Sequence, residues 1–236
     1  MKTIFISFAS KAMYRTLDRI QHEAESMNFF DEIYCCKEKD LDPTFYQKYH
    51  HFMQYSRGFG YWIWKPQIIY QYLKLINDGN IIIYCDAGCV LNPQGLPRLK
   101  EYVDMVVGDE KGILSFSLDH LEHHWTKSDL FDYFDVRHNP TITDTHQLMA
   151  TSFIIKKTDY TVKMFEEALS IIENKLYLIT DHPSQSPNFN GFIEHRHDQS
   201  ILSVLRKLVG GVVITDETYP PNQMDKPIWA SKMRML

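Results

Sequence analysis

The segment "IIIYCDAGC" (81–89) holds the first group of residues that could do chemistry. A run of β-branched residues ends on one carboxylate, Asp86, and two small residues, Ala87 and Gly88, follow it. Small residues after a strand leave the backbone free to turn and let a ligand approach closely. Asp86 is therefore either a ligand for a metal or a substrate, or an aspartate that only starts a turn. Spacing alone favours neither interpretation.

The segment "RGFGYWIWKP" (57–66) combines two glycines, three bulky aromatic residues and two cations. Its rings could enclose a planar base while Arg57 or Lys65 meets phosphate charge. Pro66 is expected to open a helix, which would put Lys65 beside free backbone amides. The alternative is an aromatic plug buried between helices, with Lys65 reaching out to water.

The segment "EHRHDQS" (194–200) is the densest titratable cluster of the chain. His195 and His197 could ligate a divalent metal, and Asp198 could orient a substrate hydroxyl or stabilise a developing positive charge. At a helix start, Asp198 could also serve only the helix dipole. Four adjacent polar groups after a long loop favour the functional interpretation.

Two further segments are compatible with sugar binding. "DHLEHHWTKSDLFDYF" (119–134) places three histidines and Trp125 before a helix expected near Thr126, and "HQLMATSFIIKK" supplies Gln147 and small residues at a strand start. Aromatic faces with a few polar groups are typical of saccharide sites. A solvated loop before a capped helix explains the first segment nearly as well.

The elements that must position these residues alternate between strands and helices. Apolar runs predict strands over 3–8, 32–36, 80–85, 112–118, 152–157 and 210–215. Helical spacing and start signals, including Ser10 and Asp42 as caps, predict helices over 10–27, 41–55, 66–78, 96–106, 126–134, 159–175 and 196–208, with a loop over 180–195. We therefore expect one α/β domain over residues 1–236, with a mostly parallel sheet flanked by helices and ligands at the carboxyl ends of the strands.

Composition narrows the class of protein. With 44% hydrophobic and 23% charged residues the chain is typical of a soluble globular protein, and its net charge of −5 argues against a nucleic-acid partner. No stretch approaches the ~20 apolar residues of a membrane span. The N-terminus reaches Lys11 too soon for a signal peptide. The four cysteines lack zinc-knuckle spacing and are expected to be reduced, so we expect a cytoplasmic protein.

Taken together, these segments resemble a GT-A-type glycosyltransferase. "YCDAGCVLNP" is similar to the strand-end Asp-x-Asp motif of that fold, "ATSFIIKK" resembles the Asn-Ser/Ala-Gly strand of glycosyltransferase family 8, and "HDQSILSVL" resembles the Asp-Gln-x-x-Leu helix start of that family. The order of the motifs agrees, over residues 3–215. "GYWIWKP", "DAGC", "WTKSDLF" and "HRHDQS" also resemble small viral and bacterial sugar transferases with this fold.

The resemblance implies transfer of a sugar from a nucleoside-diphosphate donor, a UDP-sugar in the first instance, to a glycan or other hydroxyl acceptor, with retention of configuration. By position it implies catalytic roles for Asp198 and Gln199 and a divalent cation (Mn²⁺ or Mg²⁺) at Asp86 and His197. The expected donor-binding residues are Phe8, Ala9, Arg57, Tyr61, Trp62, Lys65, Asp86, Ala87 and Gly88. The expected acceptor-binding residues are His123, Trp125, Lys127 and Gln147.

The sequence departs from the family at Gly88, which stands where a second carboxylate is usual. Hard cations prefer several oxygen ligands, so this glycine puts metal dependence in question. Without a metal, Lys65, Arg57 and Arg196 become candidates for stabilising the leaving diphosphate. Gly88 also leaves open a catalytically silent nucleotide- or sugar-binding module. A phosphatase of the haloacid dehalogenase type is the third alternative, although the second Asp and the Thr of its motif are replaced by Gly88 and Val90.

Overall fold

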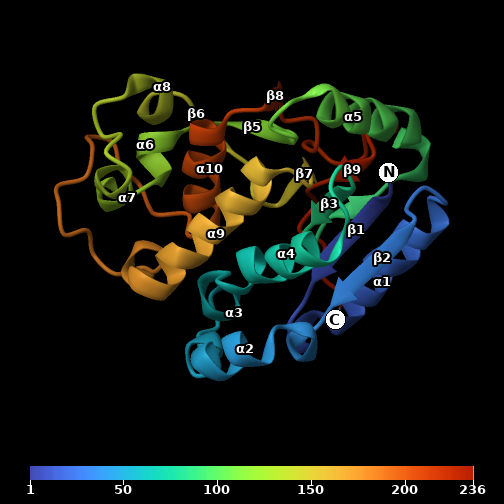
Figure 1. Ribbon diagram of the computed structural model, residues 1–236, viewed down its shortest axis with the longest axis horizontal. Coiled ribbons are helices and arrows are strands. Elements are labelled where there is room, and N and C mark those ends of the chain that lie inside the picture. Colours follow the sequence, from blue (N-terminus) through green and yellow to red (C-terminus); the bar gives the residue numbers. More distant parts are fainter. Residues whose placement is uncertain (236) are drawn as a thin grey trace.

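A seven-stranded sheet forms the centre of the protein in the computed structural model, which describes residues 1–235 (Figure 1). Its strand order is β2-β1-β3-β7-β5-β6, and β8 also pairs with β5. The strands are β1 (Thr3–Phe8), β2 (Glu32–Cys36), β3 (Ile81–Cys85), β5 (Ile113–Leu121), β6 (His146–Leu148), β7 (Ser152–Lys156) and β8 (Val212–Thr215). Only β6 and β7 run against the other five, so the sheet is mostly parallel, as predicted. A separate small sheet pairs β4 (Val90–Leu91) with β9 (Ile228–Trp229).

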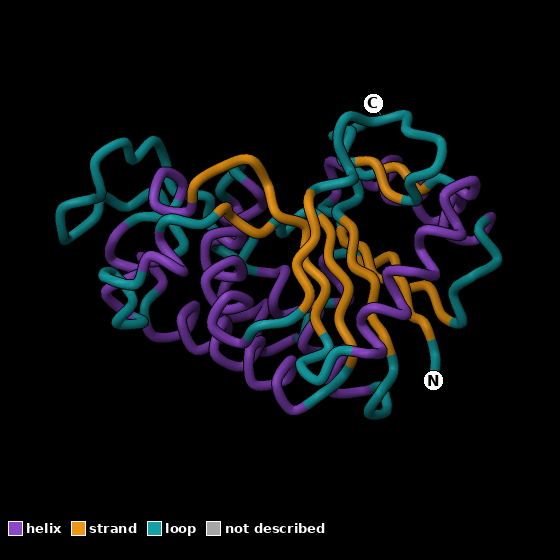
Figure 2. Tube along the Cα trace, turned by 90° about the horizontal axis from the view of Figure 1, so that it is seen from above, coloured by secondary structure: helices purple, strands orange, loops and turns teal. Residues whose placement is uncertain are grey.

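Helices cover both faces of the central sheet (Figure 2). The longer ones are α1 (Tyr14–Ser26), α4 (Trp64–Leu75), α5 (Leu96–Gly108), α9 (Asp159–Asn174) and α10 (Asp198–Val209). The shorter ones are α2 (Pro43–Tyr49), α3 (Gly58–Tyr61), α6 (Glu122–Trp125), α7 (Ser128–Tyr133) and α8 (Pro140–Thr143). Single 3₁₀ turns lie at 11–13, 38–40, 52–54, 93–95 and 176–178.

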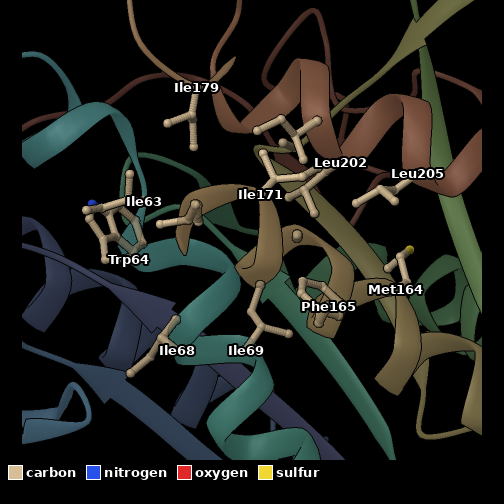
Figure 3. Close-up of a cluster of buried hydrophobic side chains, with 14 of the residues drawn as sticks. Ile63, Trp64, Ile68, Ile69, Met164, Phe165, Ile171, Ile179, Leu202 and Leu205 are labelled. Carbon is tan, nitrogen blue, oxygen red and sulfur yellow. The ribbon is translucent and has the colours of Figure 1, made fainter. Parts of the chain in front are cut away.

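The side chains of β3 explain why this strand is apolar throughout. Ile82 and Tyr84 face the core under α4, α9 and α10, whereas Ile81, Ile83 and Cys85 face the core under α1 and α5. All five are buried, as expected for a strand covered on both faces. Figure 3 shows side chains of the first core that come from α4, α9 and α10, among them Ile69, Phe165 and Leu202.

Of the three residues expected to start helices, Asp42 does so, whereas Ser10 and Pro66 do not. Asp42 caps α2, since its carboxylate accepts a hydrogen bond from Phe45 N at 2.9 Å. Ser10 makes no capping bond, and a 3₁₀ turn precedes α1. Helix α4 begins at Trp64, before Pro66, so the prediction that Lys65 precedes the helix is wrong. The shift turns Lys65 into the protein, where it is buried.

Two further observations concern the cysteines and the length of the helices. All four cysteines are free thiols. Within residues 1–235, every helix is too short or too polar to cross a membrane.

Candidate functional site

The candidate site lies at the carboxyl end of the parallel strands. In the parallel pairing of β1 with β3, Ile6 lies opposite Tyr84, so Phe8 and Asp86 reach the same edge of the sheet. Asp86 both starts a turn, because its carbonyl accepts a hydrogen bond from Cys89 N at 2.9 Å, and presents its carboxylate at this edge. The two interpretations of Asp86 are therefore compatible.

A buried lysine joins two carboxylates from distant parts of the chain. Lys65 Nζ lies 3.1 Å from Asp86 Oδ1 and 2.6 Å from Asp198 Oδ2, and it donates a hydrogen bond to Ala150 O at 3.1 Å. Tyr84 donates its hydroxyl to Asp86 Oδ1 at 2.6 Å. The side chains of Lys65 and Asp198 are only 2% and 7% exposed, whereas that of Asp86 is 27% exposed and can be reached by a ligand.

Within the triad of Lys65, Asp86 and Asp198, the pKa values of Lys65 and Asp198 depart from their ordinary values. Burial acts to lower the pKa of Lys65, but the carboxylates of Asp198 and Asp86 outweigh it and raise that pKa above its ordinary value. Burial raises the pKa of Asp198 to about 6, against the opposing effect of Lys65. With both carboxylates ionised the triad carries one net negative charge. A buried carboxyl group with a pKa close to neutral pH is typical of functional sites.

A buried polar network holds the first turn of α10 against β6. Gln199 Nε2 donates to Gln147 Oε1 at 2.7 Å, and Gln147 Nε2 donates to Glu122 Oε1 at 3.1 Å. Glu122 is fully buried and is paired with Lys207 Nζ at 2.8 Å. Gln147, expected to bind acceptor, is itself buried. Sequence reasoning missed Glu122, because the charge that neutralises it comes from a helix far along the chain.

The aromatic segment forms a left-handed turn. Gly58, Phe59, Gly60, Tyr61 and Trp62 all have positive φ, between 51° and 83°. A left-handed conformation costs roughly 1–2 kcal/mol for each residue other than glycine, so packing must hold this turn in place.

The packing that holds this turn comes from its aromatic side chains. The ring of Trp62 stacks on His197 with centroids 5.5 Å apart, that of Tyr61 lies 5.1 Å from the same ring, and that of Phe59 lies 6.4 Å from Phe8. His197 also has a positive φ, 52°. The turn is therefore fixed between the end of β1 and the start of α10, at the edge of the sheet where Asp86 lies.

Both residues of the predicted metal pair, Asp86 and His197, have partners within the protein. His197 Nδ1 lies 2.7 Å from Ile179 O, and its Nε2 lies 3.6 Å from Asp181 Oδ1. Nowhere in residues 1–235 do three or more His, Cys, Asp or Glu side chains gather in a way that could hold an ion. Asp86 Oδ1 is already engaged by Lys65 and Tyr84. An ion at Asp86 would need water and donor oxygens to complete its coordination, so metal use stays a prediction.

Three of the residues expected to bind acceptor have other partners. Lys127 is buried and donates to the carbonyls of Tyr177, Thr180 (3.2 Å) and His182 (3.4 Å). Burial lowers the pKa of Lys127 to about 8. His123 Nδ1 lies 2.8 Å from Thr143 O. The guanidinium carbon of Arg196 lies over the Trp125 ring, 4.1 Å from its centre. Lys127 thus anchors the 180–195 loop, and its predicted role with an acceptor stays untested.

The segment that ends the described chain passes over Gly88. Met233 N donates to Gly88 O at 2.9 Å, and a Cβ placed at Gly88 would lie 3.4 Å from Lys232 Cα. The neighbouring Ala87 is buried, and its carbonyl accepts from Arg19 Nη2 at 2.7 Å. Where the resemblance implies a second carboxylate, this protein therefore has a backbone contact.

Comparison with known proteins supports the fold. No protein-family model matches the chain, and no curated protein is significantly similar to it. A glycosyltransferase involved in the glycosylation of the major capsid of PBCV-1 has a similar solved structure, with a TM-score of 0.53 and 10% identity over 97% of this chain and 92% of that one. The chain has a GT-A-type α/β fold. At 10% identity this similarity shows the fold alone.

Two further solved structures are more distant in shape, each with a TM-score of 0.45. Mouse xyloside xylosyltransferase 1 is 8% identical over 91% of this chain and 72% of that one. An active-site mutant of LgtC is 14% identical over 92% of this chain and 73% of that one. The specific likeness to family 8 stays a prediction.

Proposed function

We propose that the chain is a glycosyltransferase that moves a sugar from a nucleoside-diphosphate donor, with UDP-sugars the first candidates, to a hydroxyl of a glycan or other acceptor. The observation that carries the proposal is the convergence of Lys65, Asp86 and Asp198 at the carboxyl edge of the sheet. That edge is where open α/β sheets bind ligands. The fold similarity to a glycosyltransferase supports the same conclusion.

In this proposal Asp86 and Asp198 have different roles. Asp86, the more exposed carboxylate, binds the donor ribose or an ion carried by the diphosphate. Asp198, with Gln199 beside it, faces the reacting carbon, and its negative charge stabilises the oxocarbenium-like centre. Transfer then proceeds with retention, and the leaving phosphate takes the acceptor proton. Lys65 positions both carboxylates because its ammonium lies between them.

The net negative charge of the triad bears on how a diphosphate is accepted. A divalent ion, when bound, would supply Lewis-acid stabilisation of the leaving group. Asp86 is the only residue of the triad exposed enough to hold it, through one carboxylate oxygen. We therefore propose that Mn²⁺ or Mg²⁺ enters with the donor rather than as a resident ion.

The proposal is tested by the melting temperature of the protein with a panel of nucleotides and nucleotide-sugars, each with and without Mn²⁺. At least one UDP-sugar is expected to raise the melting temperature of the wild type and to have no such effect on Asp86→Ala. If no nucleotide stabilises the wild type, or if Asp86→Ala responds as the wild type does, the proposal is wrong. Stabilisation without any turnover would instead identify the silent binding module.

A further inference from the structure

Two arginines at the rim of the candidate site converge on one carboxylate. Arg57 Nη2 lies 3.3 Å from Glu194 Oε2, and Arg196 Nε lies 3.1 Å from Glu194 Oε1. The side chains of Arg57, Arg196 and Glu194 are 44%, 37% and 41% exposed, respectively. Exposed ion pairs of this kind are weak, so a ligand anion can compete with Glu194 for the two guanidiniums.

The pair of arginines lies next to the proposed reaction centre. Arg196 is two residues before Asp198, which keeps their Cα atoms within about 7 Å. Arg57 leads into the left-handed turn whose Tyr61 and Trp62 rings pack on His197, the residue between Arg196 and Asp198. A ligand whose anion is bound at the rim can therefore extend toward Asp198.

Arg196 is held in a fixed orientation by an aromatic ring. Its guanidinium lies 4.1 Å from the centre of the Trp125 ring, and the centre of the His120 ring lies 5.2 Å from that of Trp125. A planar guanidinium stacked on an indole is prepared for two-point binding of a carboxylate. Aromatic surface beside it suits the apolar face of a sugar ring.

The charge balance of the rim favours a single carboxylate over a diphosphate. Asp181 Oδ2 lies 3.5 Å from Arg57 Nη1, so two guanidiniums face two carboxylates. Exchange of Glu194 for one ligand carboxylate preserves that balance, whereas a diphosphate would bring extra negative charge beside Asp181. Glu194 lies in the 180–195 loop, which has no helix or strand, and its neighbour Ile193 is 59% exposed. The Glu194 side chain is itself 41% exposed, so it can turn from the two arginines into solvent.

We propose that Arg57 and Arg196 bind the carboxylate of an acidic sugar, a uronic acid residue of the acceptor, and that Glu194 occupies this position until the acceptor arrives. The inference rests on the proposed function, which it extends by naming the class of acceptor. It also moves acceptor recognition from the buried Lys127 and Gln147 to the exposed rim.

The test is a titration of the full chain with methyl β-D-glucuronide, followed by NMR, against methyl β-D-glucoside, which lacks the carboxylate. We expect the glucuronide to bind at least tenfold more tightly than the glucoside. Glu194→Gln should strengthen glucuronide binding several-fold, because the internal competitor loses its charge. Arg57→Gln and Arg196→Gln should each weaken it about tenfold, and Lys48→Gln, which breaks an exposed ion pair with Glu173 elsewhere, should leave it unchanged.

Equal affinity for the two glycosides, or no effect of Glu194→Gln in a variant that melts like the wild type, would overturn the inference. A pyrophosphate titration that shows the same dependence on Glu194 and Arg196 would also overturn it, since the arginines would then belong to the donor. Asp86→Ala separates this inference from the proposed function. We expect this variant to lose donor binding and to keep its preference for the glucuronide. A wild type that binds a donor but does not prefer the glucuronide refutes the inference alone. An Asp86→Ala variant that keeps both donor binding and the preference for the glucuronide refutes the proposed function alone.

Discussion

Replacing Lys65 with methionine is the perturbation for which the structure gives the clearest expectation. The substitution keeps an unbranched side chain out to Cε but removes the ammonium that lies 2.6 Å from Asp198 and 3.1 Å from Asp86. Two carboxylates would then face each other with no cation between them. We expect both the stability and its dependence on pH to change.

The magnitude follows from the contact distances and the burial. With an effective dielectric constant of about 20, the attraction between unit charges 2.6 Å apart is roughly 6 kcal/mol, and the desolvation of Lys65 offsets part of it. Removal of one partner of a buried ion pair costs about 3–5 kcal/mol. We expect Lys65→Met to lower the free energy of unfolding by this amount at pH 8.

The loss should be smaller at pH 5. Lys65 acts to lower the pKa of Asp198, which lies at about 6, so the variant's Asp198 should titrate at a higher pH. A carboxyl group whose folded-state pKa is raised binds its proton more tightly in the folded than in the unfolded state. The variant therefore loses stability as the pH rises from the unfolded-state pKa of Asp198 to its raised folded-state pKa. Near pH 5 Asp198 is mostly protonated in both proteins, and this part of the difference disappears.

The assay is urea-induced unfolding of wild type and variant at pH 5 and pH 8. Lys48→Met, which breaks an exposed ion pair with Glu173, is the matched control and should cost less than about 1 kcal/mol. Adding Asp198→Asn to Lys65→Met should restore part of the stability at pH 8. A loss below about 1 kcal/mol at pH 8, or the same loss at both pH values, would refute the electrostatic account of the triad.

Three further predictions address catalysis, metal use and the strained turn. The rate of transfer should fall below a midpoint near pH 6, because Asp198, with a pKa of about 6, must be ionised; a kcat/KM profile that stays flat to pH 5 would contradict its role. Mn²⁺ should raise the melting temperature of Gly88→Asp more than that of the wild type, because the variant adds a second carboxylate near Asp86. The new Cβ would lie no closer than 3.4 Å to Lys232, so the substitution should fit. An unchanged response to Mn²⁺ would exclude an ion at this position. Gly58→Ala should destabilise the protein by about 2 kcal/mol or more in urea unfolding, because its Cβ would lie 2.2 Å from the Trp62 ring. Gly79→Ala, also at positive φ but with nothing within 4 Å, is the control and should cost only about 1 kcal/mol, so equal losses would contradict the packing argument.

Local pattern was sufficient for the parts of the fold that satisfy local rules. The apolar run of β3 predicted a strand buried on both faces, and its abrupt end placed Asp86 at the edge of the sheet. The amphipathic spacing of α9 and the aspartate-proline start of α2 were equally clear. In each case the signal lies within a few residues of the feature it predicts.

The features that sequence reasoning missed depend on contacts between distant segments. Lys65 was expected near free amides, yet tertiary packing starts α4 at Trp64 and pairs Lys65 with Asp198, 133 positions later along the printed sequence. Two glycines were the sole local sign of the left-handed turn, and the positive φ of Tyr61 follows from packing against His197. Isolated buried ion pairs and aromatic contacts between distant segments leave no periodic pattern in the sequence.

The central claim is that Asp198, paired with Lys65 at the sheet edge, takes part in sugar transfer. The most direct measurement is release of the nucleoside diphosphate from a panel of nucleotide-sugars, with uronic acid glycosides as acceptors, by wild type and Asp198→Asn. The account predicts release with at least one donor by the wild type and a reduction of at least a hundredfold in Asp198→Asn, while donor binding persists. Release by Asp198→Asn at the wild-type rate would contradict it, as would the absence of release with every donor.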